Sequence, residues 1–142
     1  MSFWDSSAIV PLCLYEERSP IVGKLWKQFS ERIVCWETPV EIASAIAKAE
    51  RENKIDGIRK HDAGRLLTAF EDAWVVVRPE DRIIQLARTF PSVHGLRALD
   101  SLQLAAALVW CREFPKNKDF VSADARLSKA AESEGFTVHF LN

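Results

Sequence analysis

The sequence predicts an α/β domain built on a mainly parallel sheet. Short apolar runs rich in β-branched and aromatic residues alternate along the chain with longer segments of helical period, the pattern of strands joined by helices. The chain has 142 residues, the length of one ordinary domain, and it contains no repeat, low-complexity tract or Pro/Gly/Ser-rich linker. We therefore expect a single domain over residues 1–142.

Five short segments have the composition of strands, because each is rich in β-branched or aromatic residues. In chain order they are Ser2–Trp4, Ile33–Trp36, Trp74–Val77, Asp119–Val121 and Thr137–Phe140.

Three helices are expected in the first half of the chain before residue 54. The first covers Ser7–Tyr15, where Pro11 is tolerated only near the first turn. Ser19-Pro20 then starts a helix with an apolar face. Thr38-Pro39-Val40-Glu41 forms a capping box with proline at the first helical position, and it opens a helix to about Asn53.

Capping residues, prolines and glycines also mark the starts and ends of the remaining helices. They are expected over Gly57–Ala73, Pro79–Phe90, Leu96 to about Glu113, and Asp124–Ser133, the last closed by Gly135. The segment around Ala98–Trp110 is apolar over most of its circumference, so this helix should be central and its few polar positions are informative.

Composition excludes several classes of protein. With 48% hydrophobic and 27% charged residues and a net charge of −1, the chain is neither disordered nor a protein that coats nucleic acid over its whole surface. The start of the chain has no signal-peptide pattern, and no stretch has the length of a membrane span, so we expect a cytoplasmic protein without membrane contact. Basic residues gather between residues 48 and 65 with acids interleaved, which favours a solvated helix face. The six are Lys48, Arg51, Lys54, Arg59, Lys60 and Arg65.

The three cysteines, Cys13, Cys35 and Cys111, are an odd number, lie far apart and have apolar neighbours. They are expected to be buried thiols.

Three acidic residues fall at strand ends or helix starts. Asp5 follows the first strand, Asp124 follows the fourth, and Glu41 lies in the first turn of the helix after the second strand. Each has an ordinary alternative role: a turn or N-cap for Asp5, the capping box for Glu41 and a favourable helix-dipole position for Asp124. Because the carboxyl ends of parallel strands meet at one edge, we expect all three at the edge where α/β sheets bind ligands.

Asp100 is the acid with the strongest physical argument for function. It lies in the first turns of the apolar helix, where a desolvated carboxylate is costly unless it is paired or binds a metal. Arg97, one turn earlier, is the ordinary alternative partner for an ion pair.

Four carboxylates at one edge predict a site for a hard divalent cation. Such a concentration of like charge is destabilising without a cation, and oxygen ligands suit Mg²⁺ or Mn²⁺. The reaction that this site supports best is hydrolysis of a phosphodiester by metal-activated water.

The same residues resemble the motifs of the PIN-domain family, most closely its VapC-type toxins. The resemblance rests on Asp5-Ser6-Ser7-Ala8, Pro39-Val40-Glu41, the run from Leu99-Asp100-Ser101 to Ala107, and Phe120-Val121-Ser122-Ala123-Asp124 with the residues that follow. It covers essentially the whole chain in order and spacing. It implies an α/β/α sandwich with strand order 3-2-1-4-5, which makes strands one and four neighbours and places Asp5 beside Asp124.

The resemblance also implies an activity and partners. It implies a Mg²⁺- or Mn²⁺-dependent endoribonuclease that uses Asp5, Glu41, Asp100 and Asp124, with Ser6 and Ser122 as supporting hydroxyls. Typical members form homodimers and are inhibited by a VapB-like antitoxin, whose tail would be held by the helices spanning Thr38 to Ala73. Some members carry a further acid near the fourth motif, for which the only candidate here is Asp119, so the number of metal ions stays open.

Two alternatives from other classes are distinguishable. A receiver-like phosphoacceptor would carry an aspartate at the end of the third strand, where this chain has Arg78-Pro79. A catalytically silent PIN-like module would bind RNA or protein without cutting, but all four acids are present. Scattered histidines, absent phosphate-binding glycine loops and a missing nucleophile elbow argue against zinc, nucleotide and serine-hydrolase sites.

Overall fold

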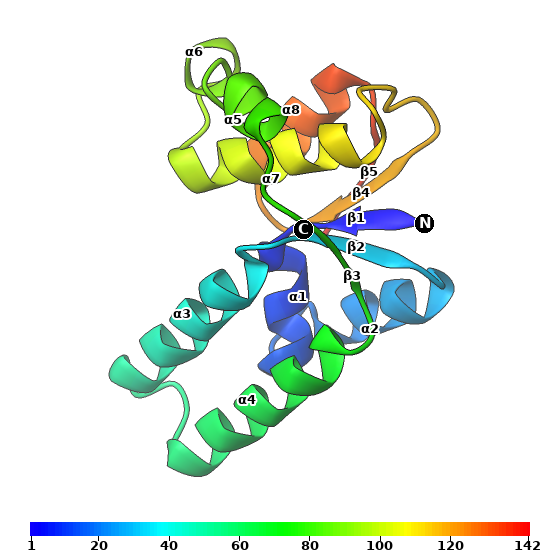
Figure 1. Cartoon of the computed structure of the whole chain (residues 1–142). Coiled ribbons are helices and arrows are strands. Elements are labelled where there is room, and N and C mark those ends of the chain that lie inside the picture. The colour runs from blue at the N-terminus through cyan, green and yellow to red at the C-terminus, as the bar shows by residue number, and fades with distance from the viewer.

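The computed structural model describes residues 1–142 as a parallel sheet between two layers of helices (Figure 1). The five strands are β1 (Ser2–Trp4), β2 (Arg32–Cys35), β3 (Val75–Val77), β4 (Asp119–Ser122) and β5 (Thr137–Phe140). They lie in the order β3-β2-β1-β4-β5, and every pair is parallel. This confirms the predicted three-layer α/β/α fold and its strand order. A receiver-like domain has the order 2-1-3-4-5, so that alternative is wrong.

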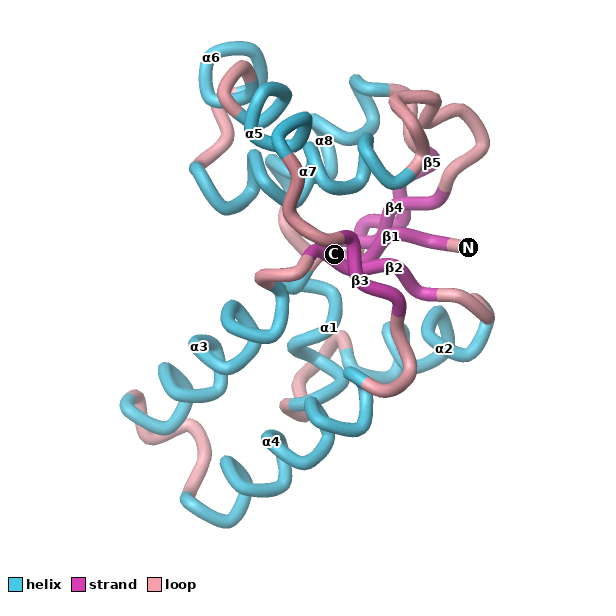
Figure 2. Tube along the Cα trace, in the orientation of Figure 1, coloured by secondary structure: helices cyan, strands magenta, loops and turns pink.

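The helices divide between the two faces of the sheet (Figures 1 and 2). One face is covered by α1 (Ser6–Cys13), α2 (Ser19–Gln28), α3 (Thr38–Arg51) and α4 (Gly57–Glu71). The other is covered by α5 (Asp81–Ala87), α6 (Phe90–His94), α7 (Ala98–Trp110) and α8 (Ala125–Glu134). The helices α3 and α4 lie side by side and extend away from the sheet (Figure 1).

Alternation along the short strands supplies a core to each layer. Phe3 in β1 and Phe120 in β4 face the α5–α8 layer, and their rings stack with centroids 5.4 Å apart. Their neighbours Trp4 and Val121 face the α1–α4 layer. Because successive strand residues point to opposite faces, a strand of three or four residues can serve both cores.

The apolar helix predicted around Ala98–Trp110 is central, as expected. The five consecutive residues Leu104–Leu108 of α7 are all buried, between the sheet and the neighbouring helices. The three cysteines are also buried and free, as predicted. No helix combines the length and the apolar character that crossing a bilayer requires.

Two details of the predicted helices are wrong. The helix expected over Pro79–Phe90 is two helices, because the chain bends after Ala87 and restarts at Phe90 with Pro91 in the first turn of α6. Pro11 lies in the second half of α1, not in its first turn. The helix ends two residues later at Cys13, and the Ser19 hydroxyl donates to the freed Pro11 carbonyl at 2.6 Å.

Candidate active site

The four predicted acids line one pocket of about 410 Å³ at the carboxyl edge of the sheet. Asp5, Glu41 and Asp124 reach it from the elements that follow β1, β2 and β4. Asp100 reaches it from α7, which runs back toward the start of β4 and so begins at this edge. Ser6 and Ser7 line the pocket as well. The structure thus brings together residues that lie more than 100 positions apart.

Asp5 is the most buried of the four acids, with only 2% of its surface exposed. Ser7 and Ser122 both donate hydrogen bonds to its Oδ2 atom, the latter at 2.9 Å, and the Ser6 hydroxyl oxygen lies 3.4 Å from Oδ1. Burial raises the pKa of Asp5 to about 7; the hydroxyl donors oppose the rise, and the charges of Glu41 and Asp100 add to it. Asp5 precedes α1, but its side chain does not cap the helix.

Glu41 faces the site instead of its own helix start. Its Oε2 atom accepts a hydrogen bond from the Ser6 hydroxyl at 2.6 Å, and Oε1 accepts from Nε2 of Gln103 at 3.3 Å. The predicted capping box is therefore wrong: Glu37 occupies the N-cap, and no side chain caps α3. Packing against α1 and α7 offers the Glu41 carboxylate better donors than the free end of α3.

Asp100 is half-buried in the first turn of α7. Burial raises its pKa to about 6; the charges of Asp124 and Glu41 also raise it, and those of Arg97 and Arg126 lower it. The alternative ion pair with Arg97 does not form, because this arginine is the exposed N-cap residue of α7.

Asp124 fills both of the roles that the sequence allowed. Its Oδ1 atom caps α8 by accepting from the Leu127 amide at 2.8 Å. The same side chain lines the pocket, and its charge raises the pKa of Asp100. The hydroxyl of Ser122 joins the two strand ends, since it accepts from the Asp124 amide at 3.0 Å and donates to Asp5.

Three polar residues beside the acids, Ser7, Gln103 and Glu37, were not predicted from the sequence. Ser7 donates to Asp5 and accepts from the Ala123 amide at 2.9 Å, which ties α1 to the end of β4. Gln103, fully buried in α7, places its Nε2 atom 2.6 Å from Glu37 and 3.1 Å from the Thr38 hydroxyl, in addition to Glu41. Gln103 was detectable in principle, because it is one of the few polar residues in the apolar helix.

Glu37 is a fifth carboxyl group next to Glu41. Burial raises its pKa to about 9, and the hydrogen bond to Glu41, the charge of Glu41 and the charge of Asp5 contribute further. Burial and the neighbouring Glu41 therefore both favour a proton on the Glu37 carboxyl. Its only signal in the sequence is its place two residues after the end of β2.

No basic side chain pairs with any of the four acids. The only cation that lines the pocket is Arg18, which pairs with Glu16 at 3.7 Å. Repulsion among the acids therefore adds to the effect of burial, which is the larger cause of the raised pKa values of Asp5 and Asp100. No three of the acidic, histidine or cysteine side chains are grouped closely enough to hold one ion by themselves. Mg²⁺ usually binds through one or two carboxylates and keeps several waters, so this donor set fits it.

Other candidate residues lie outside the pocket. Asp119 begins β4 at the opposite end of the strand, where it accepts from or pairs with the His139 ring at 2.8 Å, so it does not supply the further acid. The basic residues of α3 and α4 are exposed, and Lys48, Lys54 and Lys60 pair with glutamates of the same segment. The predicted solvated face is therefore confirmed.

Comparisons with known proteins support the fold. No family model matches the chain, and no curated protein matches it in sequence. Among solved structures, PAE2754 from Pyrobaculum aerophilum is similar over 99% of this chain and 88% of its own, with 16% identity and a TM-score of 0.66. FitAcB from Neisseria gonorrhoeae is similar over 97% and 96%, with 16% identity and a TM-score of 0.64.

A third structure, a toxin–antitoxin complex from Klebsiella pneumoniae, is similar over 87% of each chain, with 12% identity and a TM-score of 0.59. At these identities the comparisons show a shared architecture. The three-layer α/β/α fold and strand order that the resemblance implied are thus confirmed, and the chain shares this architecture with the three solved structures.

Proposed function

We propose that the chain is a Mg²⁺- or Mn²⁺-dependent endoribonuclease that acts as the toxin of a toxin–antitoxin pair in the cytoplasm. The observation that carries the proposal is a pocket in which four carboxylates meet and none of them forms an ion pair with a basic side chain. A structure of the same fold is described as a toxin–antitoxin complex, which agrees with the toxin role.

The side chains of the pocket have separate tasks in this proposal. Asp5, Asp100, Asp124 and Glu41 would hold the cation, directly or through water. A bound divalent cation lowers the pKa of a water molecule and stabilises the leaving oxygen of the phosphodiester. Ser7 and Ser122 fix the orientation of Asp5, and Ser6 joins Asp5 to Glu41. This preorganisation keeps the carboxylate oxygens in place without cost during the reaction.

The partners in this proposal are RNA, a VapB-like antitoxin and a second copy of the chain. The hairpin of α3 and α4 borders the pocket through Glu41 and Ala45 and extends away from the sheet. An extended antitoxin tail held by this hairpin would reach the carboxylates and block them.

The test is cleavage of a labelled RNA by purified chain and by Asp100→Asn. We expect cleavage that needs Mg²⁺ or Mn²⁺, is abolished by EDTA, and falls at least about 100-fold in the variant, because one ligand of the cation loses its charge. Asp119→Asn is the matched control, since this acid lies at the opposite end of β4. RNA that is bound but not cut, with no effect of EDTA, would instead support the catalytically silent module.

A further inference from the structure

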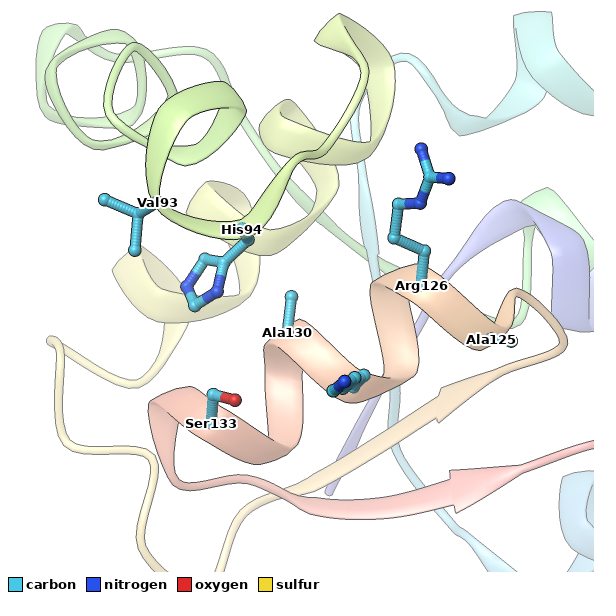
Figure 3. A pocket seen from close by; sticks show the side chains of 7 residues that line it. Val93, His94, Ala125, Arg126, Ala130 and Ser133 are labelled. Carbon is cyan, nitrogen blue, oxygen red and sulfur yellow. The ribbon is translucent and has the colours of Figure 1, made fainter.

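A second cleft, of about 580 Å³, lies between α6 and α8 (Figure 3). Val93 and His94 of α6 form one wall, and α8 forms the other. From α8 the lining includes Ala125, Arg126, Lys129 and Ser133, which the helical repeat places on one face. In Figure 3, His94 and Arg126 lie at different ends of the cleft, with Ala130 between them.

This cleft begins where the carboxylate pocket ends. Ala123 and Asp124 line the pocket, and the next two residues, Ala125 and Arg126, line the cleft. Arg126 donates to the Gly95 carbonyl at 3.3 Å, and its charge lowers the pKa of Asp100. Arg126 therefore lies between the cleft and the carboxylate pocket.

The cleft carries positive charge in a protein whose net charge is −1. No carboxylate lines it, and neither Arg126 nor Lys129 forms an ion pair. The one acid that pairs with a lining side chain is Glu134, which lies 3.3 Å from the His94 ring. In the basic segment of residues 48–65, by contrast, the three lysines pair with glutamates, and only the three arginines form no ion pair.

We infer that this cleft binds the backbone phosphates of the RNA that flank the phosphodiester in the carboxylate pocket. The inference rests on the proposed function. A strand leaving the pocket along α8 meets Arg126 and then, about 4.5 Å further along the helix, Lys129. Unpaired basic side chains next to the reacting phosphodiester can bind the neighbouring phosphates and so position the RNA. Such contacts do not depend on the base sequence. An acidic peptide bound in the cleft would be repelled by the carboxylates of the adjacent pocket.

The test measures how RNA affinity depends on salt. Fluorescence anisotropy with a labelled single-stranded RNA is recorded from 50 to 200 mM salt in the Asp100→Asn background, which prevents cleavage. Each lost phosphate contact lowers the slope of log affinity against log salt by about 0.7 for single strands. We expect the slope to fall by about 1.4 in Arg126→Gln/Lys129→Gln and by about 0.7 in Lys129→Gln alone. Affinity at 50 mM salt should fall roughly tenfold in the double variant.

The control removes the same charge elsewhere. Lys24 and Lys27 are exposed on α2, on the other face of the sheet, and Lys24→Gln/Lys27→Gln should leave the slope unchanged. If the wild type cuts RNA but the Arg126/Lys129 variant keeps the parent slope, the cleft does not bind RNA and only this inference is wrong. If the wild type neither binds nor cuts RNA, the proposed function fails and the inference with it. Weakened binding of poly-glutamate with unchanged RNA binding would assign the cleft to a protein partner and overturn the inference.

Discussion

Replacing Asp5 by asparagine should make the metal-free protein less sensitive to pH. The native pKa of Asp5 is raised from 3.8 to about 7, so between these values the folded state binds a proton that the unfolded state has lost. The stability conferred by protonated Asp5 is therefore complete below pH 4 and declines as the pH rises through 7. The total loss for this group is about 4 kcal/mol, at 1.36 kcal/mol for each pKa unit.

Most of this loss lies in an accessible pH range. From the same two pKa values, ionisation of Asp5 destabilises the wild type by roughly 3 kcal/mol between pH 5 and pH 8. Asparagine has the same shape but does not ionise. Its amide nitrogen cannot accept from the serine hydroxyls, which costs about 1 kcal/mol at both pH values and so cancels in the comparison. Removing the charge also removes the repulsion between Asp5 and Asp100, which adds to the difference between the two proteins.

The assay is urea unfolding of both proteins in EDTA at pH 5 and pH 8. We expect the free energy of unfolding of the wild type to fall between these pH values by roughly 3 kcal/mol more than that of Asp5→Asn. Equal changes in the two proteins would show that Asp5 is not held in a raised-pKa environment. In a second arm at pH 8, Mg²⁺ at 100 times its dissociation constant should stabilise the wild type by about 2.7 kcal/mol and the variant by less.

Three further substitutions separate the site from the scaffold. Glu41→Gln should reduce RNA cleavage at least about 10-fold. The free energy of unfolding should change by less than about 1 kcal/mol, because Glu41 caps no helix end. Unfolding of the variant without loss of specific activity would contradict this. Gln103→Leu keeps the side-chain volume in α7 but removes the amide that contacts Glu41. The Mg²⁺ affinity measured by calorimetry should therefore fall, while the far-UV circular dichroism spectrum stays native. An unchanged affinity would show that the amide does not position Glu41. Gly135→Ala should destabilise by about 1 to 2 kcal/mol in urea, because φ is +111° and the new Cβ would lie 3.2 Å from Pro115; the control Gly23→Ala, with open space in α2, should not.

The sequence predicted the scaffold well because strands and helices leave local patterns. All five strands lie where β-branched and aromatic residues gather, with ends displaced by at most one residue. The boundaries between helices were less predictable. The apolar pattern predicts one helix that ends at Phe90, whereas in the structure α5 ends at Ala87 and α6 begins at Phe90, with Pro91 in its first turn. The local sequence around the proline is compatible with one helix or with two. Only the packing of α5 and α6 on α7 decides between these alternatives.

The sequence by itself identified Asp5, Glu41, Asp100 and Asp124, since each falls at a strand end, at a helix start or in an otherwise apolar helix. It could not determine what each side chain contacts. Glu41 has the local pattern of a capping box, but tertiary packing places it against Ser6 and Gln103. Hydrogen-bond partners and pKa values depend on groups that are distant in sequence and meet only when parallel strands end at one edge. For that reason Glu37, Ser7 and the basic cleft along α8 became visible only in the folded chain.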